Sequence, residues 1–333
     1  MAERQPGPRE HRGAQARPTR WIAAAIDCGT NSTRLLVTDE HGAQLARELR
    51  VTRLGEGVDA RHALGRDATA RTIEALRTYR ELMDDLGVVA VRAVATSAVR
   101  DASNGQQFLD AAAATLGATV ELLSGEEEGR LAYAGAVAEL DAGKGPYVVL
   151  DIGGGSTELT ALVAGDAAPR VVSLDVGCVR LTERYLHHDP PLAGELEETA
   201  AAVRRGLDRA ATALPVLREV PQHATLVGLA GTVTTLSMLA HGWTTYDPEL
   251  VHHSELTSST VETWADRLAA ETVEARAAHA GMVEGREDVI VGGVLVMREV
   301  MRRFGFPRCI VSESDILDGL VASLAASRTA PRQ

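Results

Sequence analysis

The sequence predicts an α/β protein built from two similar domains that face each other across a cleft. Its 333 residues suit two domains of about 150 residues each. A glycine-rich stretch occurs twice, as IDCGTNSTRL at residues 26–35 and as LDIGGGSTEL at residues 150–159. The elements predicted in each half come in the same order: three strands, a helix, a strand, a helix, a strand and a helix. This repetition is the main evidence for two related domains.

The composition is that of an ordinary globular protein, with 45% apolar and 24% charged residues. Aromatic residues make up only 3% and the net charge is −12, so nucleic-acid binding is not expected. No apolar run is long enough to span a membrane. Three scattered cysteines fit a reducing compartment. We therefore expect a cytoplasmic protein that binds neither nucleic acid nor a membrane.

The second glycine-rich stretch begins in a buried strand, because residues 147–150 (YVVL) are apolar and β-branched. Three successive glycines weaken a strand, so they indicate a close approach to the backbone. The amide groups of such a turn form a concave site for phosphate. Taken alone, the stretch fits a tight hairpin with solvated acids better than it fits a phosphate-binding turn. The residues predicted to bind phosphate here are Gly153, Gly154, Gly155 and Ser156.

The first stretch aligns with the second, and its phosphate-binding residues would be Gly29, Thr30, Asn31 and Ser32. Asp27 takes the position of Asp151, and Arg34 takes that of Glu158. In the second copy, a hard cation could bridge Asp151 and Glu158 to a bound phosphate, because such cations prefer oxygen ligands.

Each half continues with an amphipathic helix, predicted at 68–86 and at 194–214. A strand follows in each half, within 91–100 and 225–234, and a last strand enters a helix at 122–131 and 310–319. The predicted organisation is a disordered basic tail (1–20), a first domain (21–138), a second domain (139–325) whose last helix (about 313–325) is a candidate to pack back against the first, and a flexible tail (326–333).

The repeated topology resembles the actin, sugar-kinase and Hsp70 superfamily. The resemblance implies two ribonuclease-H-like domains whose Asp-x-Gly hairpins clamp phosphate from both sides of a cleft. It also implies a phosphate-binding turn at Gly231 and Thr232. A sugar kinase is the weaker interpretation, because it leaves the glutamate-rich segment 124–135 and the loop of Arg100 unexplained.

Six motifs resemble more specifically the exopolyphosphatase and guanosine-pentaphosphate phosphatase family, called Ppx/GppA. They are AIDCGTNSTRLLV, ATSAVRDASN, SGEEEGRLAYAG, DIGGGSTEL, VGCVRLTE and GLAGTVTTL. The resemblance runs from about residue 24 to about residue 322. Longer members add a helical C-terminal region, so this chain resembles a short two-domain member.

The family resemblance implies a phosphoanhydride hydrolase with a catalytic carboxylate in the glutamate-rich segment. Glu128 is the first candidate for that carboxylate and Glu127 the second. The alternative is that these acids only stabilise the N-terminus of a helix, where negative charge is favourable. Glu158 is the candidate to hold the attacking water.

The same resemblance implies a Mg²⁺ site at Asp151 and Glu158, with Asp27 as the matching carboxylate of the first hairpin. Arg100 would pair with the terminal phosphate in a fork geometry, or else lie on the surface. Arg34 and Arg180 either extend the anion track or are structural.

We expect an exopolyphosphatase that uses Mg²⁺ to release orthophosphate from inorganic polyphosphate. Guanosine pentaphosphate is the alternative substrate of the same site. A non-catalytic sensor of a nucleotide alarmone is the alternative from another class, but the intact acids Glu128, Asp151 and Glu158 argue against it. A homodimer is the assembly that we consider.

Overall fold

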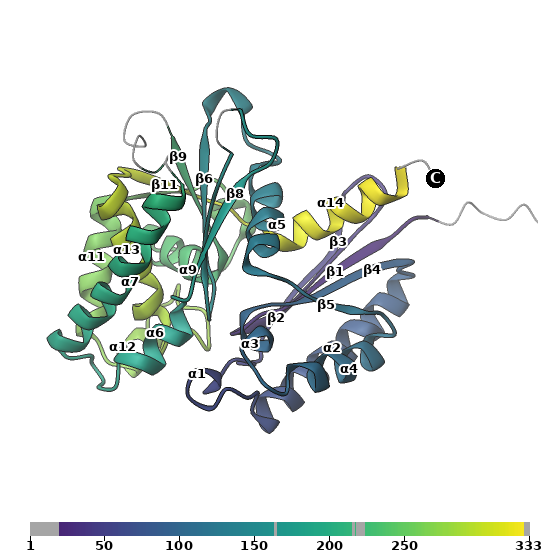
Figure 1. The fold of residues 1–333 in the computed structure, drawn as a ribbon, viewed down its shortest axis with the longest axis horizontal. Helices are drawn as coiled ribbons and strands as arrows, with labels where there is room; N and C mark the ends of the chain where they lie inside the picture. The colour runs from purple at the N-terminus through teal and green to yellow at the C-terminus, as the bar shows by residue number, and fades with distance from the viewer. Residues whose placement is uncertain (1–19, 163–164, 215–216, 218–223, 330–333) are drawn as a thin grey trace, which may run out of the picture.

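The computed structural model describes residues 20–162, 165–214, 217 and 224–329 and has two sheets, as Figure 1 shows. The first sheet has the strand order β3-β2-β1-β4-β5 and the second the order β10-β11-β9-β6-β7-β8. The first-sheet strands are β1 (Ala23–Cys28), β2 (Ser32–Thr38), β3 (Gln44–Val51), β4 (Ala90–Ala95) and β5 (Val120–Leu122). Those of the second sheet are β6 (Tyr147–Ile152), β7 (Thr157–Ala161), β8 (Arg170–Leu174), β9 (Thr225–Leu229), β10 (Glu255–Thr257) and β11 (Arg308–Val311).

The two sheets have the same topology. In each, an antiparallel meander (β3-β2-β1 or β8-β7-β6) is extended by parallel strands on the side of its first strand. The second sheet adds only the short antiparallel edge strand β10. The predicted fold class, two ribonuclease-H-like domains, is therefore confirmed. Of the two predicted tails, residues 1–19 and 330–333 lie outside the described residues. Residues 326–329 were predicted as part of the flexible C-terminal tail, but they are helical and end the last helix.

Helices cover both faces of each sheet. In the first domain α2 and α4 lie together on one face, and α14 lies on the other (Figure 1). The helices within residues 20–137 are α1 (Val58–Arg61), α2 (Arg66–Leu86), α3 (Ser97–Arg100), α4 (Gly105–Leu116) and α5 (Gly125–Val137). Those that follow are η1 (Ala142–Lys144), α6 (Cys178–Tyr185), α7 (Ala193–Ala213), α9 (Ala230–His241), α10 (Pro248–Val251), α11 (Ser258–Ala270), α12 (Val273–Ala277), α13 (Ile290–Phe304) and α14 (Ile316–Thr329).

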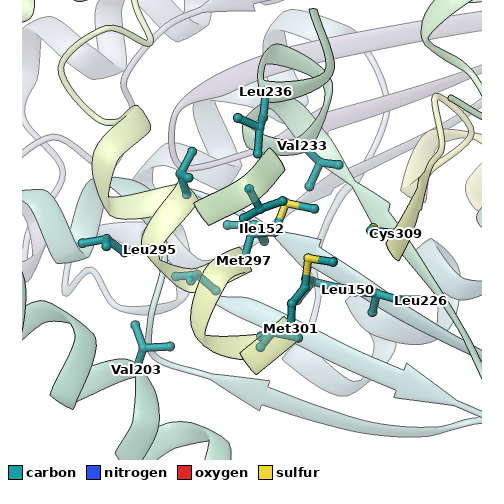
Figure 2. Packing of buried hydrophobic residues seen from close by; sticks show 14 of the residues in the cluster. Leu150, Ile152, Val203, Leu226, Val233, Leu236, Leu295, Met297, Met301 and Cys309 are labelled. Atoms are coloured by element: carbon teal, nitrogen blue, oxygen red, sulfur yellow. The ribbon is translucent and has the colours of Figure 1, made fainter. Parts of the chain in front are cut away.

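The larger apolar core lies between the second sheet and helices α7, α9 and α13. Figure 2 shows Leu150 and Ile152 of β6 facing Met297 and Met301 of α13. Methionine side chains are flexible and pack well in irregular parts of a core. No helix of the described part of the chain is both long and apolar enough to cross a membrane.

Helices α5 and α14 are exchanged between the domains. Helix α5 packs on β6, β7 and β8 of the second sheet, although the sequence assigns it to the first domain within 21–138. Packing thus corrects that boundary: a Cβ at Gly129 would lie 2.4 Å from Cγ1 of Val171 on β8, so only glycine permits this approach. Helix α14 lies on β1, β2 and β4, the position suggested for the last helix.

The two exchanged helices also contact each other closely. A Cβ at Gly135 would lie 2.0 Å from the carbonyl oxygen of Asp315, and one at Gly319 would lie 2.1 Å from that of Leu131. Small residues at both crossing points therefore let the helix backbones touch. The pair joins the two sheets on one side of the cleft, and a third apolar cluster surrounds it.

Candidate active site

The two glycine-rich stretches form equivalent hairpins. The amide of Gly29 donates to the carbonyl of Ser32 at 3.0 Å, and that of Gly153 donates to the carbonyl of Ser156 at 3.0 Å. In the strand register, Asp27 lies opposite Arg34. Asp151 lies opposite Glu158 in the same way. The alignment predicted from the sequence therefore holds in three dimensions.

The tips of the two hairpins meet across the cleft. A Cβ at Gly154 would lie 2.8 Å from Cβ of Thr30, and a Cβ at Gly155 would lie 2.4 Å from Oγ of Ser97. The sequence attributes these glycines to an approaching phosphate, but protein atoms of the first domain take up this space. Glycine is required here because the domains are in contact.

The turns still offer hydrogen-bond donors. Among the described residues, nothing accepts a hydrogen bond from the amides of Gly154 and Gly155, nor from those of Thr30 and Asn31. These residues line a cleft of about 770 Å³, within the usual range for ligand pockets. Ser32, Gly153 and Ser156 line it too. Free amides at the cleft wall suit an anion.

The glutamate-rich segment forms the first turn of α5, and its three acids point in different directions. Glu128 lines the cleft, with its side chain 12% exposed. Glu126 pairs with Arg130 at the surface. Glu127 accepts hydrogen bonds from the amide and hydroxyl of Ser124 at 3.0 and 2.8 Å, which closes a capping box. We therefore withdraw Glu127 as a candidate and retain Glu128.

Four carboxyl groups gather near the hairpins: those of Asp27, Asp151 and Glu158 are buried, and that of Glu128 is partly buried. Burial raises the pKa of Asp151 to about 7. Burial and the neighbouring Asp151 raise the pKa of Glu158 to about 8. The pKa of Glu128 is raised as well, first by burial and then by Glu158 and Asp151. This site therefore favours a group that neutralises negative charge.

Arginine side chains compensate only part of this charge. Arg34 donates to Oδ2 of Asp27 at 2.7 Å and also pairs with Asp315, which precedes α14. Arg100 donates to the carbonyl of Leu123 at 2.7 Å and lies 3.5 Å from Oε2 of Glu128. The structure thus brings Arg100, a predicted phosphate ligand, next to the predicted catalytic carboxylate.

The predicted turn at Gly231 and Thr232 divides between two environments. Gly231 lines the cleft, whereas Thr232 is 2% exposed and packs against Gly293 of α13. The guanidinium of Arg286 lies over Gly231, since a Cβ there would be 1.2 Å from its Nη1. Thr232 is therefore placed as a packing residue, and Arg286 takes its place at the cleft wall.

The sequence alone did not identify Arg286 or Ser173. Arg286 lies in the cleft wall, and its side chain pairs with no acid in the described part of the chain. Burial lowers the pKa of Arg286. Ser173 on β8 donates to Oε1 of Glu158 at 2.7 Å. Neither residue lies in one of the six motifs that carry the family resemblance, so no sequence motif pointed to either of them.

The buried carboxyl oxygens test whether Mg²⁺ fits here. Oε2 of Glu158 and Oδ1 of Asp27 have no hydrogen-bond partner among the described residues. No three His, Cys, Asp or Glu side chains of those residues are grouped as a complete metal site. Mg²⁺ is usually held by one or two carboxylates together with substrate phosphates, so an incomplete protein site is expected. The donor set of Asp151 and Glu158 fits Mg²⁺ in this way.

Comparisons with known proteins agree with the geometry. The sequence profile of the Ppx/GppA phosphatase family matches residues 36–328. Exopolyphosphatase 2 of Mycobacterium tuberculosis is 45% identical over 321 residues, covering 91% of this chain and 98% of the relative. The bifunctional 3-dehydroquinate synthase/phosphatase of Fusobacterium nucleatum is 30% identical and matches over 90% of this chain and 46% of its own length.

Solved structures are similar over nearly the whole chain. An exopolyphosphatase-like protein superposes with a TM-score of 0.87 at 33% identity, covering 92% of this chain and 99% of its own. The Ppx/GppA family member of Aquifex aeolicus superposes with a TM-score of 0.76 at 31% identity, covering 94% and 100%.

Proposed function

Because the chain belongs to the Ppx/GppA phosphatase family, we propose that it is an exopolyphosphatase. It would hydrolyse the terminal phosphoanhydride bond of inorganic polyphosphate and release orthophosphate. The observation that supports this most is the position of Glu128, a partly buried carboxylate beside Arg100 that lines the same cleft as both hairpins. The relatives named exopolyphosphatase support the same substrate class.

In this proposal the terminal phosphate binds in the cleft beside the touching hairpin tips. The amides of Gly154 and Gly155 approach it from the second domain, and those of Thr30 and Asn31 from the first. Arg100 and Arg286 supply positive charge to the phosphoryl oxygens. This arrangement aligns the scissile bond and stabilises the charge that develops on it.

Glu128 would accept a proton from the attacking water. A carboxylate with a raised pKa is a better base near neutral pH than an ordinary glutamate. The water oxygen bonds to the terminal phosphorus while the bridging P–O bond breaks, and the shortened chain leaves with the electron pair of that bond. Arg100 links this base to the terminal phosphate, which orients both.

Mg²⁺ would be held by Asp151 and Glu158, with Asp27 nearby. When bound, Mg²⁺ would neutralise charge on the phosphoryl oxygens. Ser173 orients Oε1 of Glu158 and leaves Oε2 free to face the cation or a water.

The proposal is tested by measuring phosphate release from polyphosphate, guanosine pentaphosphate and ATP, each with and without Mg²⁺. We expect Mg²⁺-dependent release that is fastest from polyphosphate. If the protein releases phosphate from none of the three substrates but binds a guanosine nucleotide tightly, it is a non-catalytic alarmone sensor and not an enzyme.

Guanosine pentaphosphate is the second candidate substrate because the cleft wall includes exposed apolar side chains. Leu49 and Tyr246 line the cleft and are 45% and 48% exposed. Exposed apolar side chains in a cleft could receive a nucleoside. A cytoplasmic location and a homodimer stay predictions.

A further inference from the structure

The first turn of α6 connects the second hairpin to the first domain through Arg180. Its Nε donates to the carbonyl of Gly155 at 2.7 Å, and its Nη1 donates to Oδ1 of Asp59 at 2.6 Å. Its Nη2 pairs with Asp101 and lies 3.4 Å from Oγ of Ser97. One side chain, 11% exposed, thus joins a carbonyl of the second domain to three side chains of the first.

These contacts leave Arg180 unavailable to the substrate. Two carboxylates neutralise its charge, and four of its five N–H directions are engaged. The cavity beside it, lined also by Thr30 and Val58, has a volume of about 10 Å³. This is room for about one water molecule and not for a phosphate. Arg180 therefore contacts protein groups only.

The backbone at the start of α6 is bonded to the same hairpin. The amide of Cys178 donates to the carbonyl of Gly153 at 3.0 Å, and that of Val179 donates to the carbonyl of Gly154 at 2.9 Å. A Cβ at Gly177 would lie 2.4 Å from the carbonyl of Gly154. The turn and the beginning of α6 are therefore bonded together, and the guanidinium of Arg180 is the side-chain group that links the carbonyl of Gly155 to the first domain.

We propose that Arg180 is a positioning residue for the phosphate clamp: it holds the turn Gly153–Ser156 against the segment Ser97–Asp101 of the first domain. Asp101 directly follows Arg100, so the same contact sets the distance between the turn amides and the arginine that faces Glu128. The consequence for catalysis rests on the proposed function. Loss of Arg180 should disturb alignment in the transition state more than substrate binding.

Arg184 provides a matched control. It pairs across the domains with the same Asp59, but it makes no contact with the hairpin, and its side chain is 42% exposed. A displacement of about 1 Å can cost roughly 10²-fold in rate, so we expect Arg180→Ala to lower kcat on the order of 10–100-fold with little change in KM. Arg184→Ala should leave kcat close to that of the wild type.

A lysine at position 180 keeps the charge but not the planar fork, so Arg180→Lys should restore only a part of the lost kcat. Equal losses in the alanine variants of Arg180 and Arg184 would overturn the proposal, because a simple charge tether would then suffice. A raised KM with an unchanged kcat would overturn it too, because Arg180 would then be a substrate ligand.

Two further measurements test the positioning role of Arg180 separately from the proposed function. If Arg180→Ala does not fold, Asp101→Asn removes one partner and keeps the arginine, and an unchanged kcat would contradict the proposal. If the wild type releases no phosphate, the proposed function fails but the positioning role is still measurable. X-ray scattering should then give a larger radius of gyration for Arg180→Ala than for the wild type and Arg184→Ala; equal radii would overturn the inference.

Discussion

The two hairpins share one backbone and differ in the residue opposite the aspartate. In the first, Asp27 faces Arg34, which also pairs with Asp315. In the second, Asp151 faces Glu158, and no arginine pairs directly with either acid among the described residues. Although burial alone would lower the pKa of Arg34, Asp315 and Asp27 raise it, so this arginine stays charged.

Because of this difference, the two hairpins have different roles in the site. In the first hairpin, Arg34 compensates part of the charge of Asp27 and Asp315, although burial still raises the pKa of Asp27. This hairpin contributes its amides to the cleft wall. The second concentrates negative charge that only a cation or protons can compensate. We therefore expect changes at the second hairpin and its neighbour Glu128 to affect catalysis, and equivalent changes at the first hairpin to affect it less.

Glu128 borders the second hairpin, and its loss should have the largest effect. Glu128→Gln keeps size and hydrogen bonding but cannot take a proton, and a positioned base contributes about 10²–10⁴-fold. We expect kcat to fall by that order while the Kd for polyphosphate stays equal or decreases, because a negative charge leaves an anion site. Steady-state rates and a binding titration measure both.

The capping residue Glu127 is the control for this substitution, since it points away from the cleft. Glu127→Gln should leave kcat nearly unchanged. If it lost activity while Glu128→Gln did not, the orientation of the first turn of α5 in this account would be wrong.

Exchanging one aspartate at a time compares the hairpins directly. Loss of even a supporting group at a metal site costs on the order of 10–100-fold in affinity, so Asp151→Asn should raise the Mg²⁺ concentration for half-maximal activity at least tenfold. Asp27→Asn should raise it much less, because Arg34 already engages Oδ2 of Asp27. Identical Mg²⁺ titrations for the two variants would abolish the proposed division.

The contact between the hairpin tips predicts a stability effect. A Cβ at Gly155 would lie 2.4 Å from Oγ of Ser97, and overpacking of this kind typically costs about 1–3 kcal/mol. Gly155→Ala should therefore lower the free energy of unfolding in a denaturant titration. Adding Ser97→Ala removes the hydroxyl and should recover part of the loss; no recovery would show that the two residues are not in contact.

The raised pKa values at the second hairpin predict a pH dependence of the stability of the metal-free protein. Burial raises the pKa of Asp151 to about 7 and that of Glu158 to about 8, whereas both are near 4 in an unfolded chain. Between about pH 4 and pH 8 the folded state thus binds more protons, so stability falls as the pH rises. Each group contributes at most about 1.4 kcal/mol per pH unit.

Thermal unfolding in the presence of a chelator measures this slope. The Tm should be lower near pH 8 than near pH 5, and Glu158→Gln should reduce the difference because it removes one of the titrating carboxyl groups. A Tm that rises over this interval would mean that the two carboxyl groups are ionised in the folded state.

The sequence alone predicted the elements that local pattern determines. Both hairpins and the helices α2 and α7 were predicted within a few residues of their observed bounds. The patterns that predict them, alternating strands with glycine turns and apolar helical periodicity, are properties of short segments. The internal repeat then gave the fold class. The resemblance that those motifs carry also led to Glu128, Asp151, Glu158 and Arg100. Of these, Glu128 and Asp151 line the cleft, Glu158 lies opposite Asp151 in the strand pair, and Arg100 lies beside Glu128.

Only the tertiary structure decided which groups meet. Glu127 and Glu128 are adjacent in sequence, yet one caps α5 and the other faces the cleft, because successive helical residues point about 100° apart. The exchange of α5 and α14 and the partners of Arg180 depend on contacts between residues far apart in the chain. Local sequence patterns hold no record of such contacts, since they arise only when the two domains pack together.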